Sequence, residues 1–158
     1  MSYGNIFGQP RLTTNSANIV VDNTSAVSSS IFQITGGPVA VRCLYGEIKV
    51  AFPNANVQFK LVGAPTGTPT PVINFCTQTS TFGTQWKVNG KFILHEQISQ
   101  PMQSSDIVIV VGVPNFSRII APGIIYHVNE NSAGGTPAQM RYNILWSPMG
   151  VNSNVQGL

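Results

Sequence analysis

Apolar and polar residues alternate in short runs along this chain, and the alternation predicts β-strands. In residues 31–35, Phe32 and Ile34 are separated by a polar residue, which is the period-2 pattern of a half-buried strand. The Gly-Gly-Pro sequence at residues 36–38 supplies turn chemistry, and a longer apolar stretch follows over residues 39–52. Residues 31–52 are therefore predicted to form a pair of strands joined by a turn.

The longer of these two strands changes face along its length. Its apolar residues occupy odd positions from Val39 to Tyr45 and even positions from Ile48 to Phe52, with Gly46 between the two sets. A change of face at a glycine predicts a β-bulge or a sharp bend at that residue. The alternative, a central strand that is buried on both faces, stays open.

Similar runs predict further strands along the rest of the chain. They cover residues 19–21, 57–61, 72–76, 86–95, 107–111 and 140–146, and also residues 119–128, where the chain turns through Pro122 into a strand at residues 124–128. The segments between them are rich in Gly, Pro, Ser, Thr and Asn, and no segment shows ten residues of helical periodicity. Eight or nine strands with such loops predict an all-β fold, an antiparallel β-sandwich or barrel, and a count of eight favours a jelly roll. An immunoglobulin-like strand order stays open.

Three of these strands indicate which residues share a face. The predicted apolar faces are Trp86, Val88, Gly90, Phe92 and Leu94; Ile124, Tyr126 and Val128; and Met140, Tyr142, Ile144 and Trp146. His127 then points away from Tyr126, and we expect both His127 and His95 at the surface or at the rim of the fold.

The strands are predicted to form one domain, residues 18–148, because 158 residues leave little room for a second domain. Residues 1–17 mix Gly, Asn, Pro, Thr and Ser with isolated apolar residues, so we expect an extended N-terminal arm. Either this arm docks on another subunit or it is a frayed terminus. Residues 149–158 are predicted to be a polar C-terminal tail.

Charged residues are unusually scarce in this chain. Apolar residues make up 42% of it, but Asp, Glu, Lys and Arg together make up only 8%, roughly a third of the usual share. Because charged side chains keep a monomer solvated and separate, this composition favours a surface that is covered by other subunits or by a larger assembly. A secreted domain rich in Ser, Thr, Asn and Gln is the alternative.

The few charges also exclude several classes of partner. The net charge of +3 comes from eight basic residues that are scattered along the chain, whereas nucleic-acid binding requires a basic patch. The longest apolar run, residues 107–111, is much shorter than a membrane helix, and no secretion signal is visible at the N-terminus. We therefore expect no nucleic-acid partner, no membrane partner, and synthesis in a cytoplasm.

Catalytic chemistry is not predicted. The five acidic residues lie in five separate segments, which disfavours a pair of catalytic carboxylates. Neither His95 nor His127 has further ligands at the spacing that zinc requires, and the chain has no Gly-x-Ser-x-Gly nucleophile motif. We expect no enzyme activity, no catalytic residue, no metal and no cofactor.

The cysteines and tryptophans have plain structural interpretations. Cys43 and Cys76 lie in apolar strand-like runs and are predicted to be buried, reduced thiols. Trp86 and Trp146 lie on apolar faces of their strands, which favours core packing over a sugar-binding platform.

An ordered series of motifs resembles small virion proteins of tailed bacteriophages. The series comprises the strand, Gly-Gly-Pro turn and strand of residues 32–48, Phe-Lys-Leu-Val at residues 59–62, the Gly/Thr/Pro loop, Pro-Gly-Ile-Ile at residues 122–125, and Arg-Tyr-Asn-Ile-Leu-Trp-Ser-Pro-Met at residues 141–149. The similar proteins are head decoration, or cement, proteins. The resemblance covers most of residues 30–151.

The resemblance implies a function and a set of partners. Cement proteins are small β-sandwiches, commonly jelly rolls, that bind the outside of an icosahedral capsid as trimers and have no catalytic residues. We therefore expect a homotrimer on the capsid surface of a virion, made in the host cytoplasm, with the major capsid protein as partner. Tyr3, Phe7 and Arg11 of the arm are the expected contacts. A tail or head-fibre adhesin that binds host glycans through residues 63–71 and 129–137 is the alternative.

Overall fold

The chain folds into two antiparallel β-sheets, so the predicted all-β class is confirmed. The computed structural model describes residues 8–21, 28–52, 57–67, 73–80, 87–94, 99–105, 118–131 and 138–158. These residues include thirteen strands and no helix, hence no helix that could cross a membrane. Several of the strands are only two to four residues long, which is why their number exceeds the expected eight or nine.

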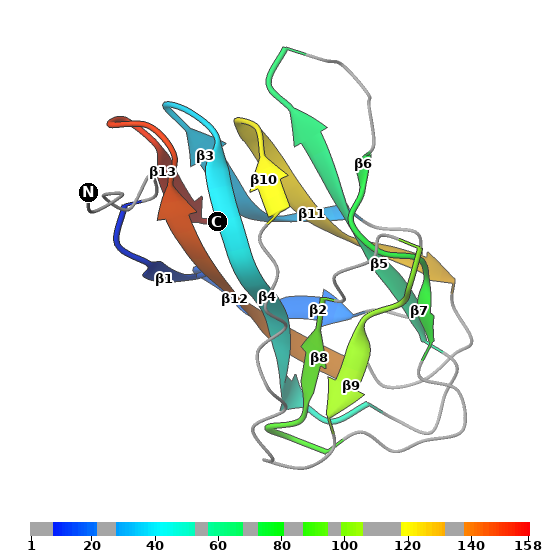
Figure 1. The fold of residues 1–158 in the computed structure, drawn as a ribbon. Helices are drawn as coiled ribbons and strands as arrows, with labels where there is room; N and C mark the ends of the chain where they lie inside the picture. Colours follow the sequence, from blue (N-terminus) through cyan, green and yellow to red (C-terminus); the bar gives the residue numbers. More distant parts are fainter. Residues whose placement is uncertain are drawn as a thin grey trace.

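Each sheet combines strands from both halves of the chain (Figure 1). Sheet A contains β1 (Arg11–Thr14), β2 (Ile19–Val21), β4 (Val39–Val50), β8 (Lys91–Ile93), β9 (Gln103–Ser105), β10 (Arg118–Ile120) and β12 (Ala138–Pro148). Sheet B contains β3 (Ser28–Thr35), β5 (Gln58–Pro65), β6 (Ile73–Asn74), β7 (Thr79–Ser80), β11 (Gly123–Asn131) and β13 (Asn154–Gly157). Strand β1 thus lies within the expected arm, and β13 lies within the expected tail.

The Gly-Gly-Pro turn connects the two sheets. β3 and β4 flank this turn as predicted, but they do not pair with each other: β3 pairs with β11 and β13, and β4 pairs with β12, β8 and β10. Gly36 has a φ of +72°, and a Cβ atom there would overlap the backbone of Asn152. Glycine is therefore required at this crossing by its conformation and by the close approach of the chain.

The change of face in β4 is real, but it does not occur at Gly46. In the pairing of β4 with β12, Arg42 and Lys49 are the extra residues, so each marks a β-bulge. The core residues of β4 are Val39 and Val41 before the first bulge and Leu44 and Ile48 after it. Gly46 instead makes room for neighbours, because a Cβ atom there would overlap the side chain of Met140.

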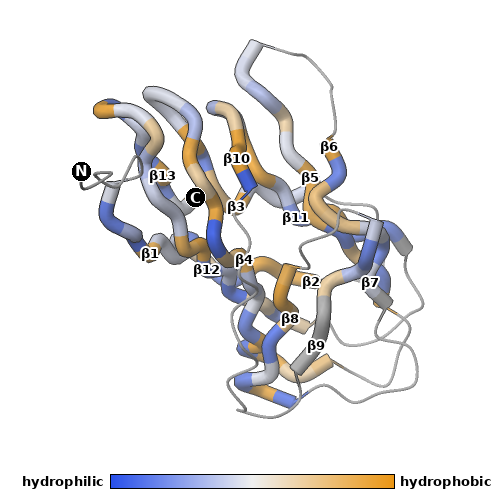
Figure 2. The backbone as a smooth tube through the Cα atoms, in the orientation of Figure 1, coloured by the Kyte–Doolittle hydropathy of each residue, from blue (hydrophilic) through white to orange (hydrophobic). Residues whose placement is uncertain are grey.

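The core lies between the two sheets and is rich in aromatic side chains. Phe52, Phe59 and Phe92 form a cluster with ring centroids 5.3 to 6.3 Å apart. The predicted inner face of β12, residues Met140 to Trp146, is confirmed, since its four alternate residues are at most 1% exposed. Apolar and polar positions alternate along the strands in Figure 2, as this packing requires.

The predicted inner face of β11 is wrong. Its buried residues are Ile125, His127 and Asn129, whereas Ile124 and Tyr126 are only partly buried on the outer face of sheet B. The expectation that His127 lies at the rim is therefore also wrong, because this side chain is completely buried. Its polar partners, described below, make its burial possible.

The predicted strand at residues 86–95 is shorter than expected and is preceded by a turn at residues 88–89. Only Lys91–Ile93 form β8, and Asn89 has a φ of +72°, a conformation that asparagine adopts more readily than most residues. Phe92 and Leu94 are in the core as predicted, but Val88 is 49% exposed. The Asn-Gly pair at residues 89 and 90 is a known turn signal, and it outweighs the alternation on either side. The predicted strand at residues 107–111 lies outside the described residues, as do Trp86 and His95.

The two edges of the sandwich differ. At one edge, β1 of sheet A meets β13 of sheet B: Thr13 Oγ1 donates to the Val155 carbonyl, and the Ser16 N–H donates to the Leu158 carbonyl. The other edge is formed by β8, β9 and β10 of sheet A and by β6 and β7 of sheet B. The chain crosses between the sheets at this second edge, where β10 leads through residues 121–122 into β11.

Candidate functional site

The outer face of sheet A presents exposed aliphatic side chains. Seven large apolar residues are exposed among the described residues, and four of them point outward from this sheet: Leu12, Val20, Val50 and Ile119. Leu12 and Ile119 are 61% and 63% exposed. The hydrophobic character of β2 and of most of β10 is visible in Figure 2. Exposed aliphatic residues that gather on one sheet face indicate an interaction surface.

Strand register extends this surface across the sheet. Leu12 is paired with Leu145, which is in turn paired with Cys43, and all three point outward. In a neighbouring row, Tyr45 is paired with Ile93. We call these outward residues of β1, β2, β4, β8, β10 and β12 the sheet A outer face. Its central rows are mostly uncharged.

Most charges of the sheet A outer face lie in one row that crosses the sheet. Arg141, Glu47 and Lys91 form one row across β12, β4 and β8. Glu47 forms an ion pair of 2.8 Å with Lys49. Arg42 lies outside this row, and its Nε donates to the hydroxyl of Ser147. The face thus has an aliphatic part around Leu12 and Ile119, and the charged row separates this part from Val20 and Val50, which lie beside Gln139.

The thiol of Cys43 lies within the aliphatic part. It is 6% exposed, and burial raises its pKa above the usual value. Cys76 is fully buried and unpaired as well, and burial raises its pKa too. The prediction of two buried, reduced thiols is confirmed. Because the thiolate is the reactive form, neither cysteine has the environment of a nucleophile.

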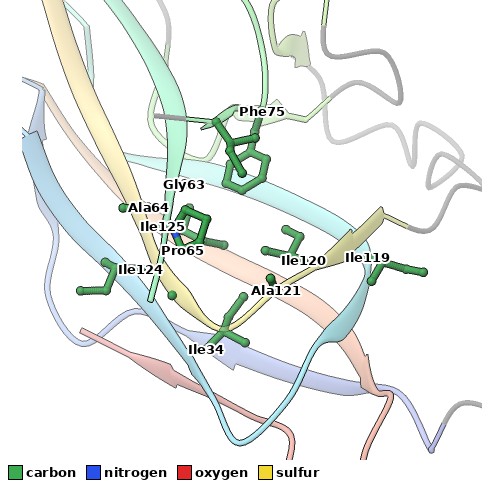
Figure 3. Close-up of a pocket in the computed structure, with 12 residues that line it drawn as sticks. Ile34, Gly63, Ala64, Pro65, Phe75, Ile119, Ile120, Ala121, Ile124 and Ile125 are labelled. Atoms are coloured by element: carbon green, nitrogen blue, oxygen red, sulfur yellow. The ribbon is translucent and has the colours of Figure 1, made fainter. Parts of the chain in front are cut away.

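An apolar hollow opens at the second edge of the sandwich, between β10 of sheet A and β5, β6 and β11 of sheet B (Figure 3). Its volume is about 180 Å³, and every residue that lines it is apolar or glycine. In Figure 3, Phe75, Ile120 and Ile34 surround the space, and Ile119 extends outward at one side. We call this hollow the β10 pocket.

Two glycines and one arginine shape the β10 pocket. A Cβ atom on Gly63 would lie 2.6 Å from the ring of Phe75, so glycine lets this ring pack over β5. A Cβ atom on Gly123 would overlap the Ala64 carbonyl, so glycine lets β11 begin against β5. Arg118 of β10 donates to the Phe75 carbonyl at 2.6 Å, and this bond joins the two sheets beside the pocket.

A polar network lies in the core, away from both surfaces. The hydroxyl of Tyr142 lies 2.6 Å from His127 Nδ1, and His127 Nε2 lies 2.7 Å from Asn129 Oδ1. Since an amide oxygen only accepts, Nε2 carries the proton, and Nδ1 accepts the proton of the Tyr142 hydroxyl. Asn129 Nδ2 in turn donates to the Val20 carbonyl. The network therefore connects β12 and β2 of sheet A with β11 of sheet B.

Burial keeps this network neutral. Desolvation lowers the pKa of His127 from 6.5 to about 4 and raises the pKa of Tyr142 well above 10. The imidazole ring also stacks on Phe59, with a centroid distance of 5.1 Å. A histidine that is completely enclosed cannot reach a substrate, so its role in this position is structural.

The structure separates the expected contact residues of the arm. Arg11 is on β1, where its guanidinium lies 5.3 Å from the centre of the Trp146 ring. Tyr3 and Phe7 lie outside the described residues. Trp146 is a core residue and donates through Nε1 to the Thr13 hydroxyl, so it is no sugar platform. Among the described residues no three His, Cys, Asp or Glu side chains are grouped as metal ligands.

Sequence reasoning did not identify either candidate surface. Both depend on which strands are neighbours, and strand order was not predicted. The sequence did contain one signal of the sheet A outer face. Residues 39–45 are apolar on both faces of the strand except for Arg42. Such a strand is typically covered on both faces, which indicates that the outer face of β4 contacts another surface. Comparison with protein-family models finds no match to this chain, and comparison with curated proteins finds no similar one.

Proposed function

We propose that this chain is a virion structural protein that binds the outer surface of an icosahedral phage capsid as a homotrimer and stabilises the shell. The observation that carries the proposal is the sheet A outer face, where Leu12, Ile119, Val20 and Val50 are at least 40% exposed. Exposed aliphatic side chains do not stabilise a monomer in water, whereas a protein that lies between neighbouring subunits buries them in its interfaces. The chain's 8% of charged residues supports the same conclusion.

We also propose that the two sheets have jelly-roll topology. In sheet A, β12 comes from the C-terminal part of the chain and lies between β2 and β4, which both come from the N-terminal half. In sheet B, β11 lies between β3 and β5 in the same way. The chain passes from sheet A to sheet B and back through β2, β3, β4 and β5, and returns through β11 and β12. This interleaving supports two nested Greek keys, the arrangement of a jelly roll.

The proposed mechanism is non-covalent clamping of adjacent capsomers. Burial of apolar area contributes about 25 cal/mol per Å², and a specific interface of standard size buries about 1,600 Å² in total. Three subunits bound together to one site reinforce each other's contacts. Arm residues Tyr3, Phe7 and Arg11 are proposed to add contacts, to the shell or to another subunit.

Glycan binding has less support in the described residues. Residues 63–65 of the first expected binding loop belong to β5, and Asn129 of the second is in the core. The β10 pocket offers no polar side chain, whereas a sugar site needs hydrogen-bonding groups beside its apolar surface.

Co-sedimentation with expanded, empty capsids tests the proposed function. The wild-type chain should pellet with the capsids, and Leu12→Asp should weaken binding at least about tenfold, because it puts a charge into the aliphatic part of the surface. Val151→Asp is the matched control, since Val151 is fully exposed but lies outside the sheet A outer face. If the wild-type chain stays in the supernatant at saturating capsid concentration, the proposal is wrong.

A further inference from the structure

We infer that the sheet A outer face binds an acidic protein surface of the shell, and that its partner there is not a second copy of this chain. The inference rests on the proposed function and names the chemistry of the partner. The row of Arg141, Glu47 and Lys91 across this face contacts carboxylates of the partner, and the exposed aliphatic side chains on both sides of the row contact its apolar groups.

The two outer faces of the sandwich differ in charge among the described residues. On sheet B, Lys60 points outward between buried Phe59 and Leu61, and its ion pair with Glu130 cancels both charges. On the described part of the sheet A outer face, four basic residues accompany one acidic residue: Arg42, Lys49, Lys91 and Arg141 with Glu47. This face therefore has an excess of positive charge.

The cations at the two ends of the charged row are not neutralised by the described residues. The carboxylate of Glu47, at the centre of the row, forms its ion pair with Lys49 at 2.8 Å. The Arg141 guanidinium donates from Nη2 to the Ser16 carbonyl, and its Nε has no acceptor in the described part of the chain. Lys91 forms no ion pair with a described residue. Both cations are therefore available to anions of a partner.

The spacing of the row specifies the partner surface. Two strand spacings of about 4.8 Å separate Arg141 from Lys91, about 10 Å in total, with Glu47 between them. A guanidinium binds a carboxylate through two parallel hydrogen bonds, and an ammonium binds it as a point charge. Exposed aliphatic residues lie on both sides of the row, with Val20 and Val50 on one side. A fitting surface thus has two carboxylates about 10 Å apart between two apolar strips.

A second copy of this chain does not offer such a surface in its described residues. Both acidic residues there, Glu47 and Glu130, already have a basic partner in their own chain. Contact between two sheet A outer faces would place excess positive charge on both sides of one interface, and like charges that face each other oppose association. The proposed homotrimer is therefore held by other surfaces, which leaves the sheet A outer face to the shell.

A nucleic acid fits this face less well than an acidic protein surface. Phosphate backbones bind clustered Lys and Arg side chains, but here the carboxylate of Glu47 lies between Arg141 and Lys91. The exposed aliphatic side chains beside the row would also have no apolar contact on a phosphate backbone.

Charge variants in the capsid co-sedimentation assay test the inference. Lys91→Glu should weaken binding at least about tenfold at low salt, because it places a carboxylate opposite carboxylates. Raising the salt concentration from about 50 to about 300 mM should weaken wild-type binding, since salt screens exposed charges. Lys60→Glu on sheet B changes the net charge by the same amount and is the matched control, with binding within about twofold of wild type.

Glu47→Gln separates a lost contact from a lost fold. This variant removes the carboxylate from the row and releases the ammonium of Lys49, so it should bind capsids at least about threefold more tightly than the wild type. A misfolded protein does not gain affinity. Lys91→Glu should also keep the wild-type mass in light scattering, because the row does not contact another copy.

The outcomes distinguish this inference from the proposed function. If the wild type pellets with capsids and both Lys91→Glu and Glu47→Gln bind as it does, the inference is wrong and the proposed function stands. A Lys91→Glu protein that binds capsids normally but has a smaller oligomer mass would overturn the inference in favour of a contact between copies. Binding of a short DNA duplex that Lys91→Glu abolishes would overturn it in favour of nucleic acid. A wild-type chain that stays in the supernatant overturns both proposals.

Discussion

The hydroxyl of Tyr142 and Nδ1 of His127 lie 2.6 Å apart in the centre of the sandwich, and their hydrogen bond joins sheet A to sheet B. Both groups are completely buried, and both remain neutral because burial disfavours their charged forms. A polar link of this kind is stable only while every member has a partner, so it makes the fold sensitive to pH and to single-atom changes.

The first prediction concerns acid stability. Burial lowers the pKa of His127 from 6.5 to about 4, so the unfolded chain binds a proton at this site before the folded chain does. The stabilisation is complete above about pH 6.5 and is lost as the pH falls toward 4, with a total loss of about 3 kcal/mol. Urea unfolding at pH 7.5 and pH 4.5 measures the loss in the free energy of unfolding between these two pH values.

His127→Gln provides the control for this prediction. Glutamine keeps a donor and an acceptor but does not titrate, so the variant should lose less stability between the two pH values than the wild type. The difference between the two proteins isolates His127 from the carboxylates, which titrate in both. Equal losses would show that His127 does not cause the acid sensitivity.

The second prediction concerns the hydrogen bond itself. Tyr142→Phe removes one oxygen atom and leaves Nδ1 of His127 without its donor, which should reduce the free energy of unfolding by about 1–3 kcal/mol. Tyr45→Phe is the matched control on the sheet A outer face and should change it by no more than about 0.5 kcal/mol. Thermal or urea unfolding at pH 7.5 compares the two, and equal effects would argue against a structural role for the bond.

The third prediction concerns the start of β11. Gly123→Ala should reduce the free energy of unfolding by about 1–3 kcal/mol, because the new methyl group meets the backbone of Ala64 and Pro65, which cannot rotate away. Gly150→Ala is the control, since its methyl group would meet only the Ser153 hydroxyl, at 3.3 Å. A Gly123→Ala protein as stable as the wild type would show that β11 and β5 can separate there.

The fourth prediction uses the two native cysteines as reporters. Both thiols should react slowly with a maleimide at pH 7 in the native protein, because burial raises the pKa of each thiol. Cys43 lies on the sheet A outer face, so binding to capsids should slow its labelling further, while Cys76 in the core serves as an internal reference. Mass spectrometry after timed labelling measures both rates. Unchanged labelling of Cys43 on capsids would place the contact on another surface.

Much of the strand content could be predicted because large apolar residues alternate strictly. The inner face of β12 and the alternation of Val57, Phe59 and Leu61 before and within β5 are as expected, since burial of such side chains dominates the choice of face. β11 was misassigned for the same reason. Ile124 and Tyr126 are more apolar than His127 and Asn129, but the latter two satisfy each other's hydrogen bonds, and single-residue hydropathy contains no information about partners.

The candidate surfaces could not be predicted because they depend on register and strand order. Leu12 and Cys43 are far apart in the sequence, and only the position of Leu145 between them brings them into one row. The same holds for the β10 pocket, where Phe75 and Ile120 meet across two sheets. The bulge in β4 was expected at the glycine, but the extra residues are Arg42 and Lys49, both of which are only partly buried.

The mass of the protein in solution tests the central claim most directly, namely that this sparsely charged surface exists to be covered by other chains. Size-exclusion chromatography with light scattering should give three times the 16.9 kDa mass of one chain, at micromolar concentration and physiological salt. A single species of 16.9 kDa over the whole concentration range, soluble and without affinity for capsids, would contradict the account.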